Sequence, residues 1–138
     1  MNKVSVNWSG DMAFEVELNG FKLIIDADEK VGGQNKGPRP KPLTLASLGG
    51  CTGMDVISIL KKMHVEPDYF NIEVSGELTE EHPKYYHKIH IKYIFKGKDL
   101  DQAKIDKAVN LSQERYCGVS ELLRKGAELT HEIEIIEA

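Results

Sequence analysis

The sequence contains little cysteine, little tryptophan and no cluster of basic residues. Among its 138 residues are 2 cysteines and 1 tryptophan, and its 18 lysines and arginines are outnumbered by 22 acidic residues, for a net charge of −4. Two cysteines are too few for a disulfide framework, and in a reducing compartment such a pair has a catalytic, redox-sensing or structural role. Without a basic stripe the chain lacks the footprint of a nucleic-acid-binding protein, so we expect no nucleic-acid partner.

The sequence also lacks long hydrophobic runs. No uninterrupted apolar run approaches the ~20 residues of a membrane-spanning helix, so we expect no membrane association. The segment from Met1 to Ser5 leads into polar, alternating residues and not into the apolar core of a signal peptide, which predicts a cytoplasmic protein. With 41% hydrophobic residues and no linker-like stretch, residues 1–138 are expected to form a single domain.

The five histidines lack the spacing of a metal site. His87 and His90 are an odd number of residues apart on a predicted strand and would point to opposite faces of a sheet, while the other three lie on separate elements. The glycine-containing loop at 32–37 lacks the spacing and the Lys-Ser/Thr ending of a phosphate-binding loop, and no nucleophile elbow supports hydrolysis. We therefore expect no bound metal and no bound cofactor.

Alternation and helical spacing predict six strands and three helices. Strands are expected at 4–8, 12–18, 21–25, 69–78, 85–95 and 129–135, and helices at 42–63, from just after Asp99 to about Tyr116, and at 119–125. Asn19-Gly20 is a strong hairpin signal, and Asp99 with Gln102 resembles a capping box. The order βββ-α-ββ-α-α-β predicts an α+β fold in which helices pack on antiparallel sheets.

The least ordinary segment runs from Gly37 to Val56, where a proline-rich loop leads into a helix that contains Cys51. Proline is tolerated in a first helical turn, and apolar residues occupy nearly every side of this helix, which predicts that it is buried. Gly49, Gly50 and Gly53 each cost about 1 kcal/mol relative to alanine, so we expect them to let another helix or a small ligand approach the thiol. Plain packing is the alternative, because a buried free cysteine is usually inert.

The second cysteine is predicted at the start of a helix. Cys117-Gly118 interrupts the helical spacing, and residues 119–125 continue it as a short further helix closed by Gly126. A thiolate at a helix N-terminus is stabilised by the helix dipole and by unpaired N–H groups.

Two segments are similar to the OsmC/Ohr family of thiol-dependent hydroperoxide reductases, and in particular to its YhfA-like branch. They are Gly37-Pro38-Arg39-Pro40 leading to the helix segment LGGCTGMDV at 48–56, and LSQERYCGVS at 111–120. The order of elements matches over essentially the whole chain. The resemblance implies an OsmC-like, intertwined homodimer, in which two long central helices back onto the sheets and the active sites lie at the subunit interface.

The resemblance also implies roles for the two cysteines. Cys51 would attack the O–O bond of an organic hydroperoxide and become a sulfenic acid, and Cys117 would condense with it to a disulfide that an external dithiol reduces. Apolar walls around Cys51 would favour organic hydroperoxides over hydrogen peroxide. The alternative function is a non-catalytic protein that keeps the fold and uses its thiol pocket for binding or redox sensing.

The sequence departs from the family at the residues that activate the thiol. The best-known peroxidases of the family use an arginine to hold the thiolate and a glutamate to orient that arginine, but the position nine residues before Cys51 is Pro42. Arg39 is the candidate cation, and Glu114 or Asp55 is the candidate carboxylate partner. Each of these is more often a solvated surface charge. We therefore expect peroxidase activity that is weaker than in members with both residues.

Overall fold

The computed structural model describes residues 1–138, which fall into two compact units, Met1–Thr44 and Leu45–Ala138. We call them the N-terminal and C-terminal units and describe each by itself. The elements occur in the predicted order βββ-α-ββ-α-α-β, with two short additions: a 3-10 turn, η1 (Glu29–Val31), and a π-helical turn, η2 (Ser112–Tyr116). The α+β class predicted from the sequence is confirmed.

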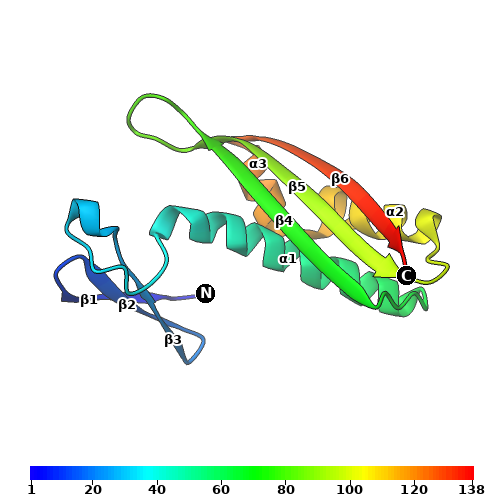
Figure 1. Ribbon diagram of the computed structural model, residues 1–138, viewed down its shortest axis with the longest axis horizontal. Helices are drawn as coiled ribbons and strands as arrows, with labels where there is room; N and C mark the ends of the chain where they lie inside the picture. The colour runs from blue at the N-terminus through cyan, green and yellow to red at the C-terminus, as the bar shows by residue number, and fades with distance from the viewer. The chain divides into compact units, whose positions relative to one another are not determined.

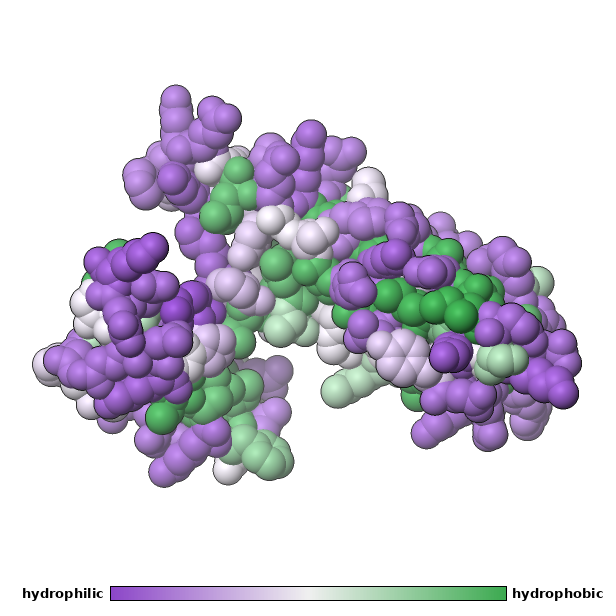
Figure 2. All heavy atoms as spheres, viewed as in Figure 1, coloured by the Kyte–Doolittle hydropathy of each residue, from purple (hydrophilic) through white to green (hydrophobic).

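The N-terminal unit is built on a three-stranded antiparallel meander of β1 (Ser5–Gly10), β2 (Ala13–Leu18) and β3 (Phe21–Ile25). Val16 lies opposite Val6 on β1 and Leu23 on β3. Asn19 and Gly20 both have positive φ, 53° and 83°, as a two-residue hairpin turn requires, so this predicted turn is confirmed. Green, hydrophobic atoms lie on the surface of this unit in Figure 2. Its exposed large apolar side chains are Val4, Val6, Trp8, Met12, Leu18, Phe21, Ile24 and Val31.

The loop after β3 is organised around the buried carboxylate of Asp26. Its oxygens accept hydrogen bonds from the backbone N–H groups of Ala27, Gln34 and Lys36, at 2.7, 3.2 and 3.1 Å. Burial by itself would raise the pKa of Asp26, but these donors outweigh it and lower the pKa. A side chain at Gly33 would collide with the carbonyl of Ala27. The glycines of this loop therefore serve a tight turn, as the sequence indicated.

The C-terminal unit contains a sheet in the order β4 (Tyr69–Leu78), β5 (Tyr86–Gly97), β6 (Glu128–Glu137). β4 and β5 form the predicted antiparallel hairpin, but β6 pairs with β5 in parallel, with Tyr93 opposite Ile133. The prediction of antiparallel sheets was therefore wrong for the last strand. The helical segment between β5 and β6 returns the chain to the end at which β5 began, and such a crossover makes the next strand parallel.

The core of this unit lies between the sheet and the helices. In Figure 1, α1 (Pro40–Lys62), α2 (Gln102–Leu111) and α3 (Gly118–Arg124) lie on one face of the β4–β5–β6 sheet. Alternation in the sequence places Ile89, Ile91, Tyr93 and Phe95 on one face of β5, and all four are buried. They pack against buried side chains of α1 and α2: Leu48, Val56, Leu60, Ile105, Ala108 and Val109.

The helix α1 differs from its prediction in three respects. It begins at Pro40 instead of between residues 42 and 44, and its fully buried residues form a single stripe that includes Leu48 and Val56, while Met54 is 77% exposed. A Cβ at Gly49 would lie 3.3 Å from Val74 Cγ2, and one at Gly53 would lie 2.9 Å from Ile72 Cδ1. These two glycines therefore let strand β4, and not another helix or a ligand, approach α1.

By length and composition α1 could also cross a membrane, contrary to the expectation from the sequence. Glycine, serine and threonine interrupt its apolar residues, so the sequence shows no continuous hydrophobic run. These residues are nevertheless tolerated in transmembrane helices. The core helix of a soluble protein meets the same criterion. Because the buried stripe of α1 packs against the sheet of the C-terminal unit, a core helix is the better description.

The second helix ends in a π-helical turn just before Cys117. Its N-cap is Asp101, whose Oδ1 accepts a hydrogen bond from the N–H of Lys104 at 3.2 Å, so the predicted cap at Asp99 was wrong. A π-helical turn within a helix frequently marks a functional site. Cys117 is then the N-cap of α3, which confirms its predicted place at a helix start.

Candidate active site

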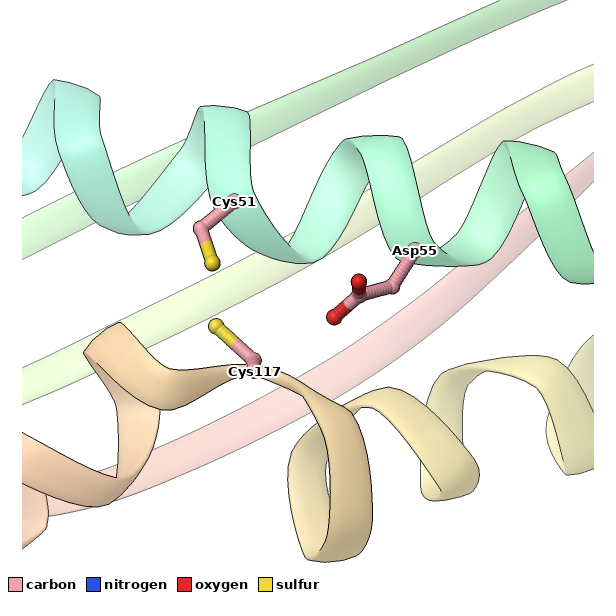
Figure 3. Close-up of side chains that lie close together, drawn as sticks. All are labelled: Cys51, Asp55 and Cys117. Carbon is pink, nitrogen blue, oxygen red and sulfur yellow. The ribbon is translucent and has the colours of Figure 1, made fainter.

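The two cysteines, 66 residues apart in the sequence, face each other across the C-terminal unit. Figure 3 shows Cys51 on α1 and Cys117 before α3, with the carboxylate of Asp55 beside them. Both cysteines are free thiols, and one ligand atom from each of the three residues lies within 4.8 Å of the other two. The structure thus confirms that the cysteines meet. Asp55 lies beside them because it follows Cys51 by four residues on α1, and residues four apart lie on one face of a helix. This spacing is the sequence signal from which its place could have been predicted.

The surroundings of the two sulfur atoms differ. Cys117 is buried, with 4% of its surface exposed, and its Sγ accepts a hydrogen bond from the N–H of Ser120 at 3.3 Å. Cys51 is half-buried. Cys51, on α1, is therefore the more accessible thiol. Cys117, the N-cap residue of α3, is the buried thiol that faces it.

Burial raises the pKa of the Cys51 thiol above its ordinary value. The N–H of Val119 acts in the opposite direction, while the hydrogen bond and charge of Cys117 and the charge of Asp55 raise the pKa further. Because the thiolate is the reactive form, these neighbours alone leave Cys51 largely protonated at neutral pH.

We expect Asp55→Asn to move the onset of Cys51 reactivity to lower pH. The amide removes a negative charge next to the thiolate but keeps the shape and an acceptor oxygen, so the pKa falls and alkylation at neutral pH becomes severalfold faster. The measurement is the rate of iodoacetamide alkylation of Cys51 against pH, followed by peptide mass spectrometry. Asp68→Asn, at an exposed loop position, is the matched control, and an identical pH profile for both variants would contradict the prediction.

A chain of buried hydroxyl groups leads from Asp55 into the core. Ser112 Oγ donates to Asp55 Oδ2 at 2.9 Å, and Thr52 Oγ1 lies 2.7 Å from both Ser112 Oγ and Tyr93 OH. A hydroxyl has one proton to donate, so Ser112 accepts from Thr52, and Thr52 in turn accepts from Tyr93. Burial raises the pKa of Tyr93, which keeps its hydroxyl protonated as this direction requires.

The chain of hydrogen bonds ends at a cation. Gln113 Nε2 donates to Tyr93 OH at 2.7 Å, and Arg124 donates to the backbone oxygen and to Oε1 of Gln113, at 3.1 and 3.4 Å. All donors therefore point from Arg124 towards Asp55. A one-directional chain of hydrogen bonds of this kind fixes the orientation of the Asp55 side chain beside the thiols. The sequence analysis did not identify this series of hydrogen bonds, because its members lie on four elements that are distant in the sequence: α1, β5, η2 and α3.

Arg39 is held within the N-terminal unit by three neighbours. Its guanidinium donates to Gly37 O at 2.9 Å and to Asn35 Oδ1 at 2.7 Å, and it lies 3.7 Å from Asp28 Oδ2. The carboxylate of Asp28 was not among the partners proposed from the sequence. Asp28 is thus a carboxylate neighbour of Arg39, although the first turn of α1, with Pro42, contains no acidic residue.

Glu114 lies on the exposed surface of the π-helical turn. It shares a pocket of about 340 Å³ with Cys117, and the other lining residues are Gln113, Arg115, Tyr116, Gly118 and Glu121. Cys51 is not part of this lining. The pocket therefore does not bear on the apolar walls expected around Cys51.

The histidines do not contribute to the site. None of them belongs to the cluster of Cys51, Asp55 and Cys117. His87 pairs with Glu77 and His90 with Glu132, while His131 meets the edge of the Tyr93 ring at 6.1 Å between centroids. Burial lowers the pKa of His131, followed by the charges of His90 and Arg124. The histidines therefore lie outside the cluster of Cys51, Asp55 and Cys117.

Comparison with known proteins gives consistent matches. The family model described as "OsmC-like protein" matches residues 33–132. "Protein YhfA" of Escherichia coli (strain K12) is 32% identical over 134 residues, which are 96% of this chain and 97% of that protein. A crystal structure of a hypothetical protein from Aquifex aeolicus VF5 is 30% identical with a TM-score of 0.88 and covers 100% of this chain and 98% of that one.

A more distant structural match carries a functional name. It is the organic hydroperoxide resistance protein OsmC from Legionella pneumophila, with a TM-score of 0.72 and 14% identity, covering 97% of this chain and 96% of that one. At this identity the match shows a common fold.

Proposed function

Because this chain belongs to the OsmC-like family, we propose that it is a thiol-dependent peroxidase that reduces organic hydroperoxides. Family membership and a structural neighbour named as an organic hydroperoxide resistance protein support a role in redox stress. The observation that carries the proposal is the approach of two free thiols, Cys51 and Cys117, to within 4.8 Å. Such a pair can alternate between dithiol and disulfide with little movement of the backbone.

The reaction proceeds in three balanced steps. The Cys51 thiolate attacks the terminal oxygen of the hydroperoxide, so that an S–O bond forms, the O–O bond breaks, and the departing alkoxide takes a proton to leave as an alcohol. The Cys117 thiolate then attacks the sulfur of the Cys51 sulfenic acid, so that an S–S bond forms and the S–O bond breaks, and the departing hydroxide takes a proton to leave as water. An external dithiol reduces this disulfide by two thiol–disulfide exchanges and is itself oxidised to a disulfide. We place this cycle in the cytoplasm, with no bound cofactor.

Arg39 is the residue that we assign to activation of Cys51. The pKa of Cys51 is raised by its surroundings, and a fixed guanidinium near sulfur is the kind of group that lowers it. The contacts of Arg39 with Asp28, Asn35 and Gly37 support this role, because they restrict the rotamers of the side chain. Glu114 lines the same pocket as Cys117, and we propose it as an acidic residue of the site in addition to Asp55.

We further propose that the protein acts as a homodimer. A three-stranded sheet that exposes Trp8 and Phe21, and a core helix that exposes Met54, leave apolar surface that a second copy of the chain would cover. Light scattering at micromolar concentration is expected to give twice the chain mass of 15.5 kDa. A monomer mass across this concentration range would contradict the proposal.

Redox sensing or thiol-pocket binding without turnover is the second candidate function. It is favoured by the raised pKa of Cys51 and by the missing acidic residue in the first turn of α1. Alkylation kinetics separate the two functions, since Cys51 of a non-catalytic protein would react with iodoacetamide no faster than free cysteine.

The proposed peroxidase function is tested by following both thiols after one equivalent of an organic hydroperoxide. We expect tert-butyl hydroperoxide to consume both thiols and to yield an intramolecular Cys51–Cys117 disulfide, because the two sulfurs already face each other. Peptide mass spectrometry identifies the products. Conversion of Cys51 to sulfinic acid while Cys117 stays a free thiol would rule out the resolving role.

A further inference from the structure

We propose that the reduced site binds one thiophilic divalent cation, Zn²⁺ being the best fit, through Cys51, Cys117 and Asp55. The ligand atoms of these residues lie within 4.8 Å of one another and all point into one space (Figure 3). In tetrahedral zinc coordination, with Zn–S near 2.3 Å, two sulfur ligands are roughly 3.8 Å apart. The two sulfur atoms thus need to approach each other by about 1 Å at most, and the carboxylate oxygen needs to approach them by slightly more, which small side-chain rotations can provide.

The chemistry of the three groups suits this ion. Two thiolates and one carboxylate are ligands of structural and catalytic zinc sites, and thiolates select zinc over magnesium or calcium. A site with three protein ligands leaves a fourth position for water. Binding releases the thiol protons, because the thiolate is the form that binds the metal.

Each of the three ligand residues already has a supporting hydrogen bond. Cys117 Sγ accepts from the N–H of Ser120, Cys51 accepts from the N–H of Val119, and Asp55 Oδ2 accepts from Ser112 Oγ. Outer contacts of this kind orient metal ligands, and their loss typically weakens metal affinity roughly 10- to 100-fold. This support distinguishes the cluster from a chance grouping of exposed acids and cysteines.

The site would exist only in the reduced protein. A Cys51–Cys117 disulfide removes both thiolates, so oxidation would release the ion, and a bound ion would shield Cys51 from peroxides and alkylating reagents. The inference goes beyond the proposed peroxidase function and does not depend on it, because binding needs only the two reduced thiols. Failure of one can therefore be distinguished from failure of the other.

The test uses Co²⁺ as a spectroscopic probe on the reduced, metal-free protein under anaerobic conditions. We expect one Co²⁺ per chain, with a near-ultraviolet thiolate-to-cobalt charge-transfer band that Zn²⁺ abolishes by displacement. Cys51→Ser and Cys117→Ser should each remove or halve the band. Ser112→Ala should weaken binding roughly 10- to 100-fold, because it removes the hydrogen bond that orients Asp55, together with the one that Ser112 accepts from Thr52. Asp68→Asn, in an exposed loop, should bind as the wild type does.

A second measurement needs no variant. Zn²⁺ should slow iodoacetamide alkylation of both cysteines in the wild-type protein, and prior oxidation with diamide should abolish Co²⁺ binding. Cobalt binding without a thiolate band, or unchanged alkylation of Cys51 at saturating Zn²⁺, would overturn the proposal. Full protection of Cys117 from iodoacetamide by Zn²⁺ in the Cys51→Ser variant would also overturn the proposal, since that variant lacks one of the two sulfur ligands.

Discussion

Replacing Cys51 by serine is expected to lower the turnover of organic hydroperoxides by at least about a thousandfold, equivalent to about 4 kcal/mol of transition-state stabilisation. The first step needs a polarizable thiolate that can accept an oxygen atom, and a serine hydroxyl neither ionises near neutral pH nor forms the sulfenic acid. The measurement is loss of hydroperoxide in the presence of several dithiol donors. Residual turnover within tenfold of the wild type would show that the chemistry lies elsewhere.

The other thiol gives the corresponding control. Cys117→Ser should still reduce about one equivalent of hydroperoxide, because Cys51 remains. Turnover should then stop, and further hydroperoxide should oxidise the Cys51 sulfenic acid to sulfinic acid, because the resolving thiol is missing.

Ser120→Ala is the matched control for the Cys117→Ser variant. It keeps the backbone N–H that donates to Cys117 Sγ and removes a buried hydroxyl that has no hydrogen-bond partner. We expect its turnover to equal that of the wild type.

Arg39→Ala is expected to reduce turnover by roughly tenfold or more, about 1.4 kcal/mol in the activation free energy. The variant removes the guanidinium that we assign to the Cys51 thiolate, so the loss should be largest below the pH at which Cys51 ionises. Asp28→Asn should give a smaller loss, because Arg39 keeps its hydrogen bonds to Gly37 and Asn35. The measurement is turnover together with the rate of Cys51 alkylation, both against pH.

Pro42→Glu tests the same assignment from the opposite direction. It supplies the carboxylate that the family places nine residues before Cys51, and it should raise turnover if Arg39 is the cation and the first turn of α1 tolerates the loss of a proline. If Arg39→Ala changes neither alkylation nor turnover, Arg39 is a loop residue only. Arg115 and Arg124 would then be the next candidates, although Arg124 already donates to Gln113 and pairs with Glu121.

The sequence predicted the secondary structure well because its signals are local. Alternation from Ile89 to Phe95 identified the inward face of β5, Asn19-Gly20 identified a hairpin, and the interruption at Gly118 identified a helix start at Cys117. Each of these features depends on a few neighbouring residues and on backbone geometry. The motifs around Cys51 and Cys117 likewise led to the family that the comparisons confirm.

The sequence by itself therefore determined the order of the elements, the two cysteines and the family. Only the tertiary structure decided that β6 runs parallel to β5, that Gly49 and Gly53 face β4, and that Asp28 holds Arg39. It also brought Asp55 to the thiols and connected it through Ser112, Thr52, Tyr93 and Gln113 to Arg124. These features depend on how elements distant in the sequence pack, and no local periodicity encodes which side chains meet when α1, β5 and the π-helical turn close around one core.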